Sequence, residues 1–256
     1  MFWLLRLVLV GVLIMAHGAP DDSDVLKEID QYRVDDMAEL AARLGSIFTY
    51  RRSGQVMLLD DFSVGLAKWD PDPLGAGAEI ALQGDYARSA GVSSRHYTPM
   101  GGATSAYLRG YYPVWGMERI AIQCEMSIEA TAEEIVLQIV YEDGADAHTW
   151  ALMYNASLNT LSYWGAGPAY HVIDPELTLY QFAGVFHNLR LVADLGTLLY
   201  GSLYVDSQEY PMAAIPACST MSVGPRYLRF TVGSRSALLV DGIVYFDNIV
   251  LTRGEI

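Results

Sequence analysis

The C-terminal stretch Ile243–Thr252 reads Ile-Val-Tyr-Phe-Asp-Asn-Ile-Val-Leu-Thr, and it decides the fold class of the chain. Its apolar residues occupy consecutive positions, which indicates a β-strand that is covered on both faces. Asp247 and Asn248 interrupt the run, and a buried carboxylate requires a cation or several hydrogen-bond donors. The stretch therefore predicts a strand in the middle of a covered sheet, with one polar interruption.

The segments that precede this stretch also have the pattern of short strands. Apolar and polar residues alternate over Met117–Met126, so that every second side chain faces a core. Leu189–Ala193 and Leu198–Val205 form two further predicted strands, joined by a turn at Asp194–Thr197. Leu177–Phe182 is expected to form another short strand. Regular strands without a strand–helix rhythm predict an all-β, antiparallel two-sheet sandwich.

Several segments resemble a known superfamily. The order "FHNLRLVADLGT", "LYGSLYVD" and a closing "VYFDNIVLT" resembles the concanavalin A-like jelly roll, which includes laminin-G-like and lectin-like domains. Asp60-Asp61-Phe62, followed by Gly65 and Lys68-Trp69, resembles the opening of the same group. Within the superfamily the chain is similar to tailed-phage virion proteins. The resemblance implies a jelly-roll β-sandwich, and it implies that Trp69 fills the core.

We expect three segments: an apolar N-terminal segment at 1–18, an arm at 19–54 and the sandwich domain at 55–256. The apolar run in the first segment has the length of a signal-peptide core, and a second interpretation places the true start at Met15. The run is too short to span a bilayer comfortably, so we expect no stable membrane insertion. Asp35–Leu44 predicts a short amphipathic helix that ends at Gly45.

Composition excludes one class of partner. The 256 residues carry a formal net charge of −14, and the 16 lysines and arginines are scattered. A nucleic-acid-binding protein presents a basic patch, so we expect no nucleic-acid partner. Cys124 and Cys218 are the only cysteines. Two buried free thiols and a disulfide across the sandwich are both consistent with the sequence.

The sequence does not contain a recognisable catalytic set. A retaining glycosidase needs two carboxyl groups about 5 Å apart. The adjacent pair Glu133-Glu134 points to opposite faces of a strand, and Glu142, Asp143 and Asp146 fall in a turn. No Gly-x-Ser-x-Gly motif is present. We therefore expect no catalytic residue and a non-enzymatic protein.

A structural calcium ion is the cofactor that the sequence suggests. Calcium requires six to eight oxygen ligands, several of which are carboxylates or carbonyls. In related jelly rolls the ion lies between the first and last strands, so the resemblance implies Asp60, Asp61 and Asp247 as candidate ligands. The alternative is that Asp247 accepts hydrogen bonds from backbone amides or from Asn248.

Aromatic residues with hydrogen-bonding neighbours are candidates for glycan binding. One group comes from the predicted meander at 135–164 and the loop after it: Trp150, Tyr154, Tyr163, Trp164 and Tyr170. A second group consists of Tyr111, Tyr112 and Trp115. Trp150 and Tyr154 share one face of a predicted strand, so their alternative role is in the core.

These observations lead to three hypotheses about function. In the first, the chain is a structural or adhesive virion protein of a tailed phage, in the capsid or tail, that displays a lectin-like jelly roll. Its partners are other virion proteins or further copies of itself, bound through the arm, and cell-surface polysaccharide. In the second, it is a secreted bacterial carbohydrate-binding module. The third, a glycoside hydrolase or lyase on the same fold, is disfavoured by the missing acid pair.

Overall fold

The computed structural model describes residues 54–88, 91–100, 104–114, 116–129, 133–236 and 241–255 of the chain. Its regular secondary structure within those ranges consists of strands. No helix in the described ranges has the length and hydrophobicity needed to cross a bilayer. The predicted apolar segment, the arm and its helix at Asp35–Leu44 lie outside the described residues, apart from Gly54.

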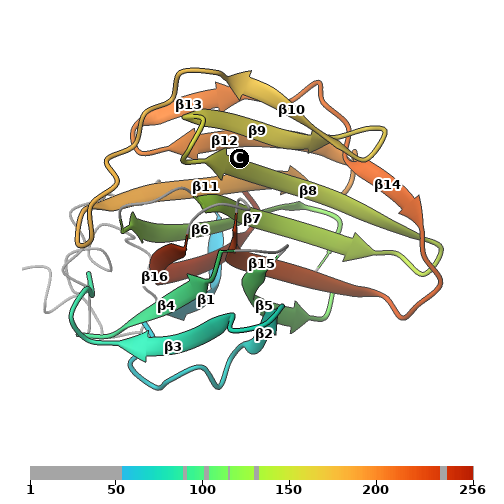
Figure 1. Cartoon of the computed structure of the whole chain (residues 1–256). Helices are drawn as coiled ribbons and strands as arrows, with labels where there is room; N and C mark the ends of the chain where they lie inside the picture. The colour runs from blue at the N-terminus through green and yellow to red at the C-terminus, as the bar shows by residue number, and fades with distance from the viewer. Residues whose placement is uncertain are drawn as a thin grey trace, which may run out of the picture.

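The described strands form two antiparallel sheets that pack face to face (Figure 1). Sheet A has the order β13 (Gln208–Pro211), β12 (Leu199–Val205), β11 (Phe186–Asp194), β6 (Arg119–Ile128), β16 (Gly242–Arg253), β4 (Ser93–Thr98) and β3 (Glu79–Gln83), with β1 (Gln55–Asp60) also paired to β16. Sheet B has the order β10 (Ala169–Asp174), β9 (Thr160–Gly165), β8 (Asp146–Asn155), β7 (Glu133–Glu142), β15 (Tyr227–Ser236), β5 (Ser105–Tyr112) and β2 (Asp70–Leu74), with β14 (Cys218–Met221) paired to β8. The predicted all-β antiparallel sandwich is confirmed.

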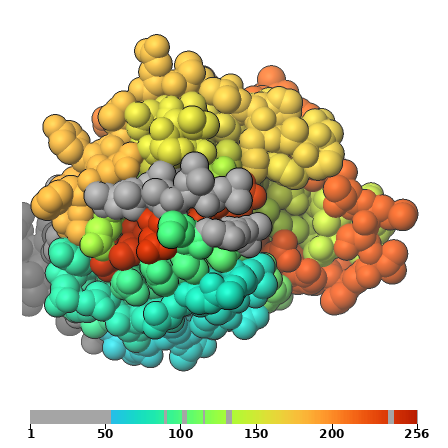
Figure 2. All heavy atoms as spheres, viewed as in Figure 1, coloured from blue at the N-terminus to red at the C-terminus, as the bar shows by residue number. Residues whose placement is uncertain are grey.

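β16 is the central strand that the sequence predicts. It pairs with β6 along one side, and with β4 and then β1 along the other. Its residues are buried on both faces, from Val244 to Val250 and beyond. In the space-filling view, the red C-terminal segment appears between the yellow and blue-green parts of the surface (Figure 2). The polar interruption is a β-bulge, at which Asn248 has a φ of 46°.

The core lies between the sheets and follows the predicted alternation. Ile120, Ile122, Cys124 and Met126 of β6 are at most 1% exposed and belong to one continuous apolar cluster. Trp69, which follows β1 in the chain, contributes its ring to the same cluster, as expected. Burial of these side chains supplies the main driving force for the sandwich.

Both cysteines are buried free thiols, which decides between the two alternatives left open by the sequence. Burial raises the pKa of the Cys124 thiol far above its usual range. The thiol therefore remains protonated and packs as a small apolar side chain.

One predicted strand is wrong. Leu177–Phe182 forms no strand and belongs to no described sheet. The backbone amide of Leu179 donates to the Tyr154 hydroxyl rather than to a neighbouring strand, and Tyr180 is 77% exposed. The sequence also failed to indicate β2, β5, β10, β13 and β14. β2 contains two prolines, which lack an amide donor and are tolerated only because β2 is an edge strand.

Candidate functional site

The face of sheet B that points away from the core is the candidate site, and we call it the outer face. Side chains alternate along a strand, and Ile135, Leu137, Ile139 and Tyr141 of β7 lie in the core cluster. The intervening side chains therefore point to the outer face. The same parity holds across the sheet, because neighbouring strands are paired in register.

Two rows of paired residues cross the outer face. The first row runs through the strands from β2 to β8: Asp70, Arg109, Thr231, Gln138 and Ala151. The second row extends from β2 to β10: Asp72, Tyr107, Gly233, Val136, Met153, Ser162 and Val172. Small residues thus form the floor of the face, while aromatic and charged residues rise from it.

Gly233 allows the Tyr107 ring to approach the floor of the outer face closely. A Cβ atom at position 233 would come within 2.5 Å of the Tyr107 Cδ1 atom, and closer still to the carbonyl oxygen of Ala106. Only glycine leaves room for this arrangement. The Arg109 guanidinium lies 5.8 Å from the centre of the Tyr107 ring and pairs with Asp72 at 2.6 Å. Tyr107 is therefore held between backbone and guanidinium, which suits a rigid contact surface.

Two of the predicted glycan-binding aromatics, Trp164 and Tyr170, meet on the outer face. β9 and β10 place them directly opposite each other, with ring centres 4.8 Å apart in an edge-to-face arrangement. Both side chains are half-buried. Burial raises the pKa of the Tyr170 hydroxyl to about 12, so this hydroxyl stays protonated and can donate a hydrogen bond.

An ion pair lies beside these aromatics. Arg235 of β15 pairs with Glu134 of β7, its strand neighbour, and a guanidinium nitrogen lies 3.8 Å from the Met153 sulfur. The positive charge of Arg235 favours the ionised forms of the Tyr107 and Tyr170 hydroxyls, so it acts to lower the pKa of each. The outer face therefore combines aromatic rings with fixed hydrogen-bonding groups.

The other predicted aromatics of this group lie elsewhere. Trp150 and Tyr154 are 0% exposed and belong to the core, which is the alternative that the sequence left open. The Trp150 indole donates to the Leu199 carbonyl at 3.0 Å, so its polar atom is satisfied internally. Tyr163 packs against the core and stacks on His171, with ring centres 5.2 Å apart. In this structure a polysaccharide has no access to Trp150 or Tyr154, because they face the opposite sheet.

The second aromatic group is also divided. Tyr111 is 48% exposed on the outer face, and its ring lies 5.7 Å from that of Tyr227. Tyr112, the next residue, points inward and contacts Phe230 edge to face. Trp115 lies outside the described residues. Adjacent residues of a strand point to opposite faces, so the group does not form one surface.

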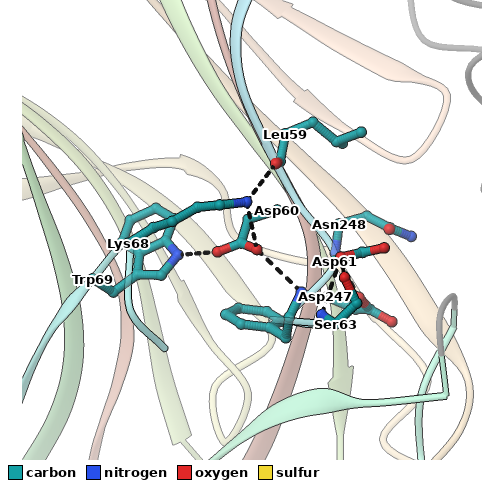
Figure 3. Close-up of polar contacts among 9 residues, drawn as sticks. Leu59, Asp60, Asp61, Ser63, Lys68, Trp69, Asp247 and Asn248 are labelled. Atoms are coloured by element: carbon teal, nitrogen blue, oxygen red, sulfur yellow. Dashed lines mark hydrogen bonds and ion pairs between the residues drawn. The ribbon is translucent and has the colours of Figure 1, made fainter. Parts of the chain in front are cut away.

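The predicted calcium ligand Asp60 lies at the end of β1, in a site filled by donors (Figure 3). Its carboxylate is 0% exposed. One oxygen accepts from the Trp69 indole at 2.6 Å. The other accepts from the Lys68 ammonium at 3.1 Å and from the Phe62 amide at 3.2 Å. A lysine charge in contact with the carboxylate disfavours a metal cation at the same oxygens.

Asp61 and Asp247 lie nearby, because Asp60 pairs with Ile249 of β16 (Figure 3). The Asp61 carboxylate accepts from Ser63. One oxygen of Asp247 accepts from the Arg88 amide at 2.7 Å, and the other accepts from the Asn248 amide at 2.8 Å. Within the described ranges, no group of three or more His, Cys, Asp or Glu side chains has an arrangement suited to a metal ion. The described residues thus fit calcium poorly, and the calcium ion that the sequence suggested is left to the experiment that follows.

Removal of divalent cations tests this point. Because donors already surround Asp60 and Asp247, we expect the same melting temperature with and without a chelator. Differential scanning calorimetry in calcium and in EDTA makes the comparison. A melting temperature that falls in EDTA, but not for Asp247→Ala in EDTA, would instead establish a calcium site at Asp247.

Sequence reasoning missed most of the polar residues of the outer face. Arg109, Gln138, Arg229 and Arg235 come from β5, β7 and β15, three strands that are distant in sequence. Tyr227, Arg229, Thr231 and Arg235 do occupy alternate positions, a period of two that marks the outward face of β15. That signal identifies the face of a strand but not the strand beside it.

Comparisons with known proteins bear on the fold. No protein-family model and no curated protein sequence matches the chain. An endo-β-1,4-glucuronan lyase from the fungus Trichoderma reesei has a TM-score of 0.52 and 12% identity, and the match covers 77% of this chain and 95% of that one. The potassium-bound carbohydrate recognition domain of Emp46p has a TM-score of 0.46 and 14% identity, with coverage of 77% and 94%. A carbohydrate esterase from Shiga toxin-encoding bacteriophage phi24B has a TM-score of 0.47 and 14% identity, with coverage of 79% and 100%. The likeness to the lyase establishes the β-sandwich fold of this chain, and at this identity it establishes the fold alone.

Proposed function

We propose that the protein is a non-enzymatic polysaccharide-binding jelly roll whose binding surface is the outer face of sheet B. The observation that carries the proposal is the Trp164–Tyr170 pair beside Tyr107, on a floor of small residues. Flat rings stack on the apolar faces of sugar rings, and polar side chains between them bind hydroxyl groups.

The polar groups of the outer face support this proposal. Gln138 is half-buried, and the Thr231 hydroxyl is buried without a partner among the described residues. The two residues are opposite each other on β7 and β15. The Thr231 hydroxyl is covered by its neighbours, so the half-buried Gln138 amide is the group of this pair that a bound sugar hydroxyl can contact.

The biological setting is part of the same proposal. Its basis is the sequence resemblance to tailed-phage virion proteins, in which such a domain acts by presenting a surface. Many copies on a virion convert weak single sites into tight attachment. Docking on other virion proteins through residues 19–54 belongs to this proposal, as does a location in the virion. The alternative setting is a secreted bacterial carbohydrate-binding module.

Substitution of the aromatic pair tests the proposal. We expect Trp164→Ala and Tyr170→Ala each to weaken polysaccharide binding about tenfold or more, because each removes a ring of the contact surface. Affinity electrophoresis of the full chain in gels that contain a panel of neutral and acidic polysaccharides measures retention. Chromatography of the same mixtures measures product release.

Phe182→Ala is the matched control. Phe182 is 68% exposed, and its carbonyl accepts from Ser127 of sheet A, away from the outer face. Equal retention of wild type, control and outer-face variants would contradict the assignment of the surface. Release of oligosaccharides by the wild type would contradict the non-enzymatic part of the proposal.

A further inference from the structure

We infer that the saccharide bound by the outer face carries carboxylate groups, as in a uronic-acid polymer, and that Arg229 binds one of those carboxylates. This inference rests on the proposed function. It goes further because it names the chemical class of ligand and the residue that selects it.

Three arginines of sheet B point to the outer face, and two of them have a carboxylate partner. Arg109 pairs with Asp72, and Arg235 pairs with Glu134. Arg229 makes no hydrogen bond or ion pair within the described residues, and its Nε atom is buried without a partner. A guanidinium group that is partly removed from water and unpaired is destabilising, and a carboxylate satisfies its charge and two of its donors together.

The strand neighbours of Arg229 do not neutralise its charge. Its strand neighbours on the outer face are Val140 of β7 and Tyr111 of β5, neither of which is charged. Along β15 the next outward residue is Thr231, whose hydroxyl also has no described partner. Successive outward residues of a strand are about 7 Å apart, so a sugar residue that contacts Arg229 lies over the buried Thr231.

Glu142 is the acidic residue closest to Arg229 by register. It lies opposite Tyr227, diagonal to Arg229, and its Oε1 atom accepts from the Tyr227 hydroxyl at 3.5 Å. Its Oε2 atom is buried without a described partner, and no ion pair joins it to Arg229. Glu142 therefore repels a ligand carboxylate without neutralising Arg229 by direct contact. Replacement of Glu142 therefore tests whether Arg229 binds a ligand carboxylate or balances the charge of Glu142.

The experiment compares matched polymers. Polyglucuronate, alginate and polygalacturonate are each tested beside the same polymer with its carboxyl groups reduced to primary alcohols. We expect the full chain to bind at least one acidic polymer about tenfold or more tightly than its reduced form, because hydrogen bonds to charged groups are the stronger ones. Affinity electrophoresis and calorimetric titration measure the two dissociation constants.

Variants then assign the preference to Arg229. Arg229→Gln is expected to remove the preference for the acidic polymer. Arg229→Lys keeps the charge without the planar fork and is expected to retain part of the preference. Glu142→Gln is expected to strengthen binding of the acidic polymer. Arg119→Gln, which removes an arginine paired with Asp194 on sheet A, is the matched control and is expected to change neither constant. Melting temperatures identify variants that unfold.

The outcomes separate the two proposals. Equal binding of acidic and reduced polymers, or a preference that survives in Arg229→Gln, overturns the inference and leaves the proposed function standing. Weaker acidic-polymer binding by Glu142→Gln also overturns it, since Arg229 then serves Glu142. Retention of none of the polymers, acidic or reduced, overturns the proposed function together with the inference.

Discussion

Replacement of Asp60 by alanine is expected to lower the free energy of unfolding by about 3 kcal/mol. The carboxylate is fully buried and accepts from the Trp69 indole, the Lys68 ammonium and the Phe62 amide. Without it, the indole nitrogen of a core tryptophan loses its acceptor, and the lysine loses its counter-charge. The turn after β1, in which Phe62 has a φ of 59°, loses the bond that fixes it.

Denaturant titration followed by tryptophan fluorescence measures this change. Asp61→Ala is the matched control, because Asp61 is the next residue and its carboxylate bonds to Ser63 within its own turn. We expect the control to lose no more than about 1 kcal/mol. A loss below about 1 kcal/mol for Asp60→Ala would show that the indole and ammonium groups find other partners.

Acidification is expected to destabilise the sandwich through His96. This residue of β4 is 0% exposed; its Nδ1 lies 2.9 Å from the Ala106 carbonyl of β5, and its Nε2 lies 3.0 Å from the Ser94 hydroxyl. The contact to Ala106 joins sheet A to sheet B. Burial lowers the pKa of His96 to about 4, from an ordinary value of 6.5. The folded protein therefore holds this ring neutral over a range in which the unfolded chain protonates it.

The sign and size of the effect follow from proton linkage. Below pH 6.5 the unfolded state binds a proton that the folded state does not, so stability falls as the pH falls, until both states are protonated near pH 4. A difference of about 2.5 pKa units corresponds to about 3 kcal/mol. Urea titrations at pH 7 and pH 4 measure the fall, and His96→Gln removes this contribution. An equal fall in the wild type and the variant would assign the acid sensitivity to other groups.

The fold was predictable because it is encoded in local patterns. Consecutive apolar residues in Ile243–Thr252 gave a central strand, and the structure confirms it as β16. Alternation in Met117–Met126 identified the core side of β6 correctly. Both patterns arise because burial on one or two faces restricts which residues a strand tolerates. The same kind of pattern gave a wrong strand at Leu177–Phe182, because two of the apolar residues there, Tyr180 and Phe182, are exposed rather than buried.

The candidate site depended on information of another kind. Trp164 and Tyr170 were identified as candidates from their aromatic character, and so were Trp150 and Tyr154, which the structure buries. The two pairs differ in the side of the strand on which their side chains lie and in whether that face of the sheet is covered. The type of a single residue indicates neither property. Local sequence chemistry alone therefore determined that this chain forms an antiparallel β-sandwich with a polar interruption in its last strand. Only the tertiary structure decided that Tyr107, Gln138 and Arg229 share a face with Trp164, because non-local strand pairing sets which distant residues become neighbours.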